Sequence, residues 1–198
     1  MVIGNEFHLS LIKNKNNQMK VYLFLADGFE EIEAITPIDI FRRANLDVIT
    51  VSISDNKLVR GAHDISIMAD CLFAETDFHE NDLLYLPGGM PGTKNLDAHQ
   101  GLKELLQNQA TENKKIAAIC AAPSILGKMG LLTSKEAICY PGFEDQLVGA
   151  ILSNEKIVIS GNVSTAKGAG VVVEFALKLV EELTDKQTAD KIAKSICI

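Results

Sequence analysis

Three short, almost wholly apolar runs stand in this chain, and each is followed by a turn and a helical segment. The runs are KVYLFL at residues 20–25, DLLYL at 82–86 and KIAAI at 115–119. Short runs rich in β-branched and aromatic residues are typical of strands buried on both faces of a parallel sheet. Helical patterns at residues 30–44, 99–113 and 121–129 predict covering helices. The sequence therefore indicates an α/β fold, with a mostly parallel sheet and helices on both of its faces.

The other segments extend this pattern. In the first helix Ile32, Ile35, Ile38 and Phe41 repeat at helical spacing, and Thr184 is expected to cap the last helix. The remaining expected elements are strands at residues 47–53, 137–140, 156–160 and 163–165, helices at 168–183 and 184–194, and an exposed ribbon at 57–68 that turns at Gly61.

Length and composition place limits on domain number and partners. The 198 residues suit one domain at residues 19–198, preceded by a poorly ordered extension at residues 1–18. The formal charge is -7 and the basic residues are scattered, so we expect no nucleic-acid binding. Since no apolar run reaches the roughly 18 residues of a membrane helix, we expect no membrane span. The four cysteines lack CxxC spacing, which argues against a metal site and favours reduced thiols in the cytoplasm.

Cys120 stands where the third apolar run leads into a helix. In KIAAIC-AAPS, the small residues Ala121 and Ala122 permit a sharp turn. Unpaired N–H groups and the positive end of a helix dipole favour a thiolate at such a position. A free cysteine after a buried strand is also commonly an inert core residue, so this junction alone leaves the two interpretations evenly matched.

A glycine pair follows the strand at residues 82–86. Gly88 and Gly89 let the backbone approach a ligand, and their N–H groups are suited to stabilise an oxyanion or the oxygens of an oxidised sulfur. The same glycine pair is also explained by an ordinary turn between a strand and a helix. No phosphate-binding GxGxxG or GxxxxGK[ST] motif is present, and we expect no cofactor.

Acidic residues crowd the first helix start, in DGFEEIEA. They suit the helix dipole, but Glu33 shares its stripe with Pro37 and Ile40 and is therefore a candidate to point inward. Pro37 also cannot donate to the carbonyl of Glu33, four residues back. A carboxyl buried beside Cys120 would have a raised pKa and would donate a hydrogen bond to the sulfur. Periodicity alone does not choose among the three glutamates.

The histidines give little support to a cysteine peptidase. Such an enzyme needs a histidine base near the sulfur. None of the histidines follows a core strand: His8 lies in the extension, and the other three are expected at the surface, namely His63, His79 and His99.

Four segments, in order, resemble the ThiJ/PfpI superfamily, and the resemblance spans about residues 19–194. The segments are GFEEIEA, LPGGMPGTKNL, IAAICAAPSILGKMGLL and KGAGVVVEFALKLVEEL. The chain is most similar to the branch of the parkinsonism-associated protein deglycase and its bacterial ThiJ/YajL-like relatives. The resemblance implies a flavodoxin-like three-layer sandwich that forms a homodimer.

The resemblance also implies roles for individual residues. Cys120 matches the nucleophilic, oxidation-sensitive cysteine, and Glu33 matches the carboxyl that donates to its sulfur. Gly88 and Gly89 match backbone donors that face the site, and Ala121 supplies the amide that follows the nucleophile.

The chain departs from the family pattern at several positions. Tyr140 stands where dyad-bearing members have a histidine, and a phenol is a poor base at neutral pH. The SRGPG loop of the family reads AKGAG, with Lys167 for arginine and Ala169 for proline, which suggests a looser loop. His63 lies near the position of an arginine contributed by the partner subunit, and Ser124 occupies a threonine-like pocket position.

These observations favour a cysteine-dependent enzyme that acts on small dicarbonyls or their thiol and amine adducts, of the deglycase or glyoxalase type. They disfavour a peptidase. The main alternative is a redox sensor or stress-response chaperone in which Cys120 is oxidised to a sulfinate. A scaffold with an inert thiol is a third interpretation.

Overall fold

The computed structural model describes residues 19–78 and 82–198 of the chain. The expected N-terminal extension, which includes His8, and the segment that contains His79 lie outside the described residues.

Seven strands form the central sheet, in the order β10-β11-β7-β6-β1-β2-β5. Neighbouring strands run parallel except for the antiparallel pair β10 and β11. The strands are β1 Lys20–Leu25, β2 Asp47–Ser52, β5 Cys71–Leu72, β6 Leu83–Leu86, β7 Lys115–Ile119, β10 Ile157–Ser160 and β11 Val163–Ala166. The three apolar runs thus lie side by side as β7, β6 and β1, which confirms the mostly parallel sheet.

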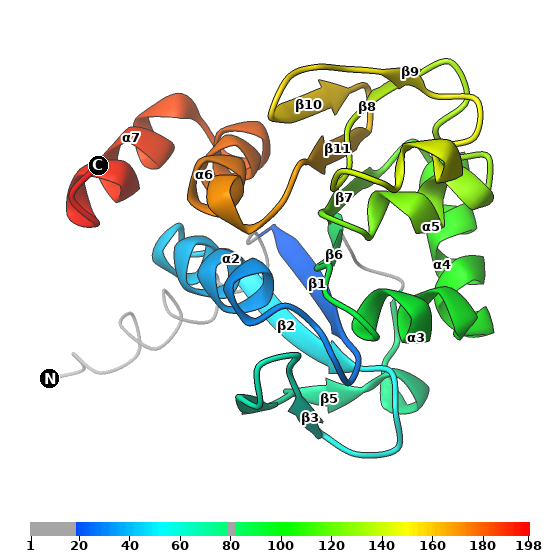
Figure 1. The fold of residues 1–198 in the computed structure, drawn as a ribbon. Helices are drawn as coiled ribbons and strands as arrows, with labels where there is room; N and C mark the ends of the chain where they lie inside the picture. Colours follow the sequence, from blue (N-terminus) through cyan, green and yellow to red (C-terminus); the bar gives the residue numbers. More distant parts are fainter. Residues whose placement is uncertain (1–18, 79–81) are drawn as a thin grey trace, which may run out of the picture.

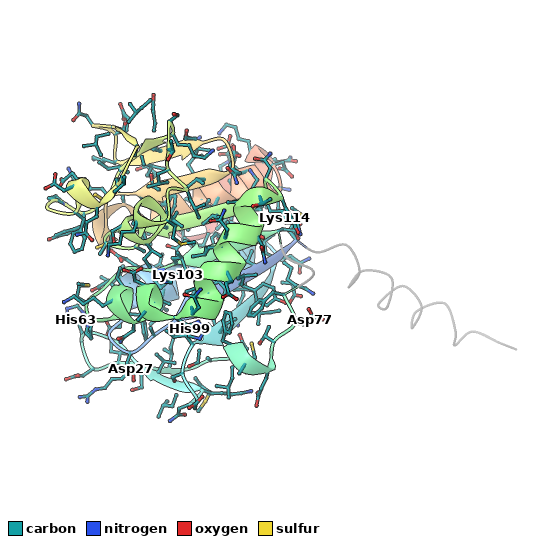
Figure 2. The ribbon with its side chains drawn as sticks, turned by 90° about the vertical axis from the view of Figure 1, so that its right-hand side faces the viewer. Asp27, His63, Asp77, His99, Lys103 and Lys114 are labelled. Carbon is teal, nitrogen blue, oxygen red and sulfur yellow. The ribbon has the colours of Figure 1, made fainter. Side chains whose placement is uncertain are left out.

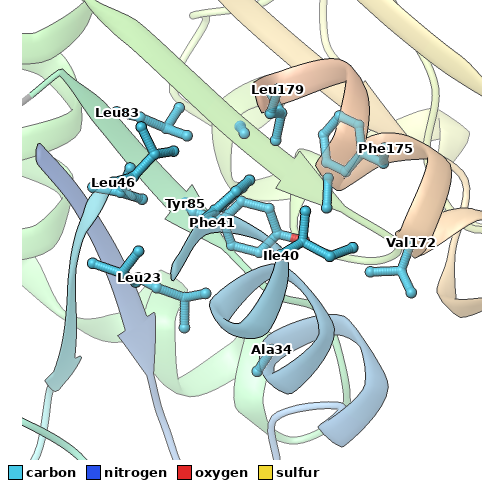
Figure 3. Packing of buried hydrophobic residues seen from close by; sticks show 14 of the residues in the cluster. Leu23, Ala34, Ile40, Phe41, Leu46, Leu83, Tyr85, Val172, Phe175 and Leu179 are labelled. Carbon is cyan, nitrogen blue, oxygen red and sulfur yellow. The ribbon is translucent and has the colours of Figure 1, made fainter. Parts of the chain in front are cut away.

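Helices cover both faces of this sheet (Figure 1). One layer holds α2 Glu31–Arg43, α6 Val172–Leu183 and α7 Lys186–Ser195, and the other holds α3 Gly92–Ala98, α4 Gln100–Thr111 and α5 Pro123–Lys128. Along β1, Val21 and Leu23 pack into the core beneath α2 and α6, whereas Tyr22 and Phe24 pack into the core on the α4 and α5 side. Figure 3 shows the first of these cores, around Phe41, Tyr85 and Phe175. The fold is the expected flavodoxin-like three-layer sandwich.

Short elements decorate the sheet. An antiparallel hairpin turns after Gly61, as expected for the ribbon at residues 57–68. The strands of this hairpin are β3 Leu58–Arg60 and β4 Ser66–Met68. A second short pair is formed by β8 Glu136–Ala137 and β9 Ile151–Leu152. The 3₁₀ turns are η2 Phe73–Glu75, η3 Glu144–Gln146 and η4 Ala169–Val171. The strand expected at 137–140 ends early, because the N–H of Ile138 donates to the Thr165 hydroxyl at 3.0 Å.

One local expectation for the helices is wrong, and a second feature is decided by the structure. Thr184 does not cap α7, because its hydroxyl turns back to the Val180 carbonyl at 2.7 Å and Asp185 accepts from the Thr188 N–H instead. In α2 the stripe of Glu33, Pro37 and Ile40 is buried, so Glu33 points inward as the sequence allowed, and the start of the isoleucine repeat does not. Ile32 and Ile35 are 52% and 40% exposed, whereas Glu33 is 1% exposed. The helix therefore turns an acidic residue toward the core and two isoleucines toward its outer surface.

Within the described ranges, no helix is long and apolar enough to cross a membrane.

His99 is more than the surface residue expected from the sequence. Its Nδ1 accepts from the Leu102 N–H at 3.0 Å and so caps the beginning of α4. The ring packs edge-on against Phe73, with centroids 4.5 Å apart, and Figure 2 shows His99 at this helix end. Burial lowers the pKa of His99 and thereby favours the neutral ring that can accept.

We predict that His99→Ala lowers the free energy of unfolding by about 1 kcal/mol at neutral pH, the usual cost of losing an N-cap. His99→Asn, which retains an acceptor, should recover most of this loss. Because the folded-state pKa of His99 lies below its usual 6.5, its contribution is present above that pH and is lost on acidification. Urea unfolding of the three proteins measures this, and equal stability of the Ala and Asn variants would contradict the capping role.

Candidate active site

The candidate site lies where the central parallel strands end. β6 and β7 pair in register, with Leu86 opposite Ala118, so the turns that follow them begin side by side. Gly88 comes two residues after β6, and Cys120 directly follows β7. Glu33 reaches the same edge from the first turn of α2, which follows β1. Ligands commonly bind at the carboxyl edge of an open parallel sheet.

Cys120 sits in a backbone conformation that side chains rarely adopt. Its φ is 64°, and two hydrogen bonds hold it. Its N–H donates to the Ala166 carbonyl at 2.9 Å, and its carbonyl accepts from the Tyr140 N–H at 2.8 Å. A non-glycine residue with positive φ carries strain and is often found at functional sites. The neighbouring strand β11 and the Tyr140 segment thus fix a half-buried thiol on a sharp turn.

Tyr85 positions the turn of α2 that carries Glu33. Pro37 has no N–H to donate to the Glu33 carbonyl, and the buried Tyr85 hydroxyl donates to that carbonyl instead, at 3.1 Å. The sequence revealed the missing donor at Pro37, but it gave no sign that a side chain from β6 would replace it. Tyr85 is therefore a positioning residue that the sequence analysis missed.

The Glu33 carboxyl is buried and hydrogen-bonded to the Cys120 thiol. It also accepts from the Gly88 N–H at 3.0 Å, and the nearby Ala169 amide lowers its pKa slightly. Burial raises the pKa of Glu33 from 4.5 to about 7, although these donors oppose the rise. Glu33 thus gains and loses its proton near neutral pH.

The Cys120 thiol does not have the lowered pKa that a helix N-terminus was expected to give. Burial is the main cause that raises the pKa of Cys120 to about 12, and the charge of Glu33 and the hydrogen bond to Glu33 add to it. The amides of Ala121 and Gly89 lower this pKa, but by less. The reason lies partly in α5, which begins only at Pro123 and has six residues. Ionisation of the thiol is therefore coupled to that of Glu33, because a neutral carboxyl donates to the sulfur and does not repel its charge.

Gly88 and Gly89 contribute in different ways. A Cβ on Gly88 would lie 2.6 Å from Glu33 Oε2 and 2.7 Å from the Cys120 Cβ, so only glycine fits between the two side chains. The Gly88 N–H is directed to the Glu33 carboxyl, whereas the amides of Gly89 and Ala121 interact with the sulfur. The amides near the sulfur are therefore those of Gly89 and Ala121 rather than that of Gly88.

Two of the other candidate residues, Tyr140 and Lys167, line a surface cavity, and a third, Ser124, is buried. Tyr140 is 51% exposed and packs beside Gly168, and Tyr140 and Lys167 line the same surface cavity. Ser124 is buried in the first turn of α5, where its N–H donates to the Ala121 carbonyl.

His63 belongs to a separate cluster, on a loop away from α4 (Figure 2). Its N–H and its Nδ1 meet the Glu31 carboxylate at 2.7 and 2.9 Å, and the hydrogen bond to Glu31, with the charge of Glu30, raises the pKa of His63. Ligand atoms of Glu30, Glu31 and His63 lie within 4.8 Å of one another. Because these hydrogen bonds already explain the cluster, the geometry does not require a metal.

Comparisons with known proteins agree with this fold. Residues 19–182 match the model of the DJ-1/PfpI family. Protein dj-1beta of Drosophila melanogaster is 34% identical over 89% of this chain and 95% of its own length. DJ-1 homolog B of Arabidopsis thaliana is 36% identical over 88% of this chain, which covers only 40% of the plant protein. The structure of oxidized Toxoplasma gondii DJ-1 superposes with a TM-score of 0.87 at 36% identity, covering 90% of this chain and 97% of that one.

The chain therefore belongs to the DJ-1/PfpI family, within its DJ-1 branch. Two further relatives carry an activity in their names. The glutathione-independent glyoxalase DJ-1 of Schizosaccharomyces pombe is 31% identical over 90% of this chain and 98% of its own length. The glutathione-independent glyoxalase DJR-1.2 of Caenorhabditis elegans is 32% identical over 85% of this chain and 90% of its own length.

We predict that the wild-type protein loses stability relative to Glu33→Gln as the pH rises. The folded-state pKa of Glu33 is raised from 4.5 to about 7, so its stabilising contribution is fully present below 4.5 and is lost as the pH rises through 7. The full loss is on the order of 3 kcal/mol, since each pKa unit corresponds to about 1.4 kcal/mol. The amide introduced by the substitution mimics the neutral carboxyl and does not ionise.

Urea unfolding at several pH values measures the difference between the two proteins. Glu155→Gln, at an exposed position, is the control and should follow the wild type. A stability difference between wild type and Glu33→Gln that stays constant with pH would show that Glu33 does not titrate in this range.

Proposed function

We propose that this chain is a cysteine-dependent enzyme that acts on reactive dicarbonyls or on their thiol and amine adducts, with a glyoxalase- or deglycase-like activity. The observation that carries the proposal is the hydrogen-bonded pair of Cys120 and Glu33, with the amides of Gly89 and Ala121 at the sulfur. The glyoxalase names of relatives that match most of the chain support the substrate class.

The pair supplies the first step of such a reaction. The Cys120 thiol passes its proton to the Glu33 carboxylate as the sulfur attacks the aldehyde carbon, and the C=O π electrons move to the oxygen. The amides of Gly89 and Ala121 stabilise this oxyanion, and Glu33 returns the proton to it. The product is a hemithioacetal on Cys120.

A glyoxalase outcome needs one more proton transfer and a water. The Glu33 carboxylate removes the carbon-bound proton of the hemithioacetal and delivers it to the adjacent carbonyl carbon, by way of an enediol. Water then hydrolyses the resulting thioester and releases a 2-hydroxy acid. A pKa of about 7 suits Glu33 for this work, because a general acid–base is most effective near the operating pH.

This arrangement does not favour a peptidase. Among the described residues, His63 is bound to Glu31 and His99 caps α4, so Glu33 is the base that the hydrogen bonds provide to Cys120. Tyr140 contributes its main-chain N–H to the Cys120 carbonyl.

A redox sensor is the second candidate, and the same amides favour it. Peroxide would oxidise the sulfur to a sulfenate and a second peroxide to a sulfinate, with one water released at each step. The amides of Gly89 and Ala121 and a neutral Glu33 would then donate to the sulfinate oxygens.

We predict that Cys120→Ser lowers the turnover of methylglyoxal by about a thousandfold or more, because a serine hydroxyl beside Glu33 is a far weaker nucleophile. Glu33→Gln should retain the fold but lose most of kcat, since the amide cannot accept the proton. Lactate formation followed by chromatography measures both, and Cys139→Ser serves as the control for a buried cysteine.

If Cys120→Ser kept wild-type turnover, the proposed mechanism would be wrong. If wild type showed negligible turnover but peroxide oxidised Cys120 selectively, as measured by mass spectrometry, the sensor would be favoured.

We also propose a cytoplasmic homodimer. The four cysteines are unpaired, in keeping with a reducing compartment. Ile32 and Ile35 of α2 are exposed, and so are Leu58, Ile65 and Met68 of the β3–β4 hairpin, whose turn bonds to Glu31 at the start of the same helix. The Ala62 N–H of this hairpin donates to the Phe29 carbonyl, at 2.8 Å, just before α2. Apolar side chains gathered on one surface are typical of a contact between subunits.

We predict that the double variant Ile32→Glu and Ile35→Glu shifts the protein from dimer to monomer, because two charges would be buried in the contact without partners. Light scattering coupled to size-exclusion chromatography measures the mass. Val148→Glu and Ile151→Glu, at exposed apolar positions near β9, form the matched control and should leave the dimer intact. A wild-type monomer, or a dimer that survives the α2 substitutions, would contradict this surface.

A further inference from the structure

A surface cavity of about 410 Å³ opens beside the Cys120–Glu33 pair. It is formed where β10 begins and β11 ends, together with the loop that leads into α6 and the Tyr140 segment. The lining residues are Tyr140, Pro141, Lys156, Lys167, Gly168, Ala169, Gly170 and Val171. The proposed dicarbonyl chemistry, as derived above, makes no use of this space.

Two lysines line the cavity from directly opposite positions. In the antiparallel pair of β10 and β11, Ile157 faces Ala166, and the ladder continues with the Lys167 N–H donating to the Lys156 carbonyl at 2.9 Å. Residues opposite each other on such a ladder project their side chains to the same face, and like charges at these positions destabilise the pair. The lining contains no carboxylate, and among the described residues neither lysine forms a salt bridge.

The cavity adjoins the reacting groups through one loop. A Cβ on Gly168 would lie 3.9 Å from Glu33 Oε1 and 3.4 Å from the Tyr140 ring, and the amide of the next residue, Ala169, lies near the Glu33 carboxyl. The Cys120 N–H donates to the Ala166 carbonyl, one residue before Lys167. Gly168 therefore separates a ligand in the cavity from the carboxyl of Glu33, which lies beside the Cys120 sulfur.

The start of α6 adds to the positive character of the cavity. Val171, a lining residue, occupies the N-cap position of this 12-residue helix, and no side chain caps it. The N-terminal end of a helix carries a partial positive charge and favours anions.

We infer that the cavity between Lys156 and Lys167 is a substrate subsite, which holds an oxyanion group, carboxylate or phosphate, of the carbonyl compound whose aldehyde carbon reacts at Cys120. This inference rests on the proposed function and narrows its substrate class. An anion between the two ammonium groups offsets their mutual repulsion, and the anchored end orients the aldehyde toward the sulfur.

Kinetics with two matched substrates test the preference. Phenylglyoxal is neutral, and 4-carboxyphenylglyoxal has the same reacting group and carries a carboxylate. We expect kcat/KM to favour the anionic compound by roughly tenfold at low salt, mostly through KM, and the preference to shrink as salt is added. Lys156→Gln with Lys167→Gln should abolish the preference and leave phenylglyoxal turnover unchanged. Lys191→Gln, at an exposed position on α7, is the charge-matched control.

A second measurement does not depend on turnover. Alkylation of Cys120 by iodoacetate and by iodoacetamide forms the same S–CH₂ bond and releases iodide in both cases, but only iodoacetate is an anion. Mass spectrometry of the Cys120 peptide gives the ratio of the two rates. We expect the double lysine variant to lower the iodoacetate-to-iodoacetamide ratio by roughly tenfold relative to the wild type and to Lys191→Gln.

The outcomes separate the two proposals. If the ratio falls but no protein turns over either glyoxal, the subsite stands and the proposed activity fails. If both glyoxals are turned over and the double variant changes neither the preference nor the ratio, the activity stands and the subsite is overturned. Inhibition of wild-type alkylation by acetate and by inorganic phosphate identifies the preferred anion, and inhibition by neither also overturns the subsite.

Discussion

The burial of one carboxyl group, that of Glu33, determines how the carboxyl edge of the sheet is built. A carboxyl removed from water must find hydrogen bonds, and Glu33 finds them in the thiol of Cys120 and in the amides of Gly88 and Ala169. These partners come from three different strand-following segments, so the one carboxyl joins the turns after β6, β7 and β11. The same burial raises the pKa of Glu33 to about 7, which couples the assembly of the site to its proton chemistry.

The architecture could be predicted from the sequence because buried parallel strands have a strong local signal. KVYLFL and KIAAI became β1 and β7 at the expected residues. Features that depend on tertiary contacts could not be predicted in this way. β5, with two residues, pairs with the end of β2, and α3 begins at Gly92 in a segment rich in glycine and proline, so neither has a periodic pattern. The apolar repeat of α2 gave the helix but not its buried face.

For the site, sequence patterns identified the residues but not their electrostatics. The Cys120 turn, the glycine pair and the acidic helix start were all evident, and family resemblance rather than periodicity distinguished Glu33 from its neighbours. The pKa of Cys120 was expected to fall, and it is raised to about 12, because burial and the charge of Glu33 outweigh two backbone amides. Desolvation depends on everything packed around a group, and a strand-turn-helix pattern carries no measure of it.

The departure of the loop from SRGPG has a consequence for this balance. Proline at position 169 would have no N–H, whereas Ala169 provides one near the Glu33 carboxyl. A donor to the carboxylate stabilises its charged form and lowers its pKa, which opposes the effect of burial. In the proposed mechanism, with Tyr140 in place of histidine, Glu33 is the base beside Cys120, and its carboxylate must be populated near neutral pH to accept the thiol proton. The Cys120 thiol, the Gly88 amide and the Ala169 amide together oppose the rise that burial causes in the pKa of Glu33, and Ala169 contributes the least of the three. A substitution that first indicated a looser loop therefore also adds a small contribution to the proposed base.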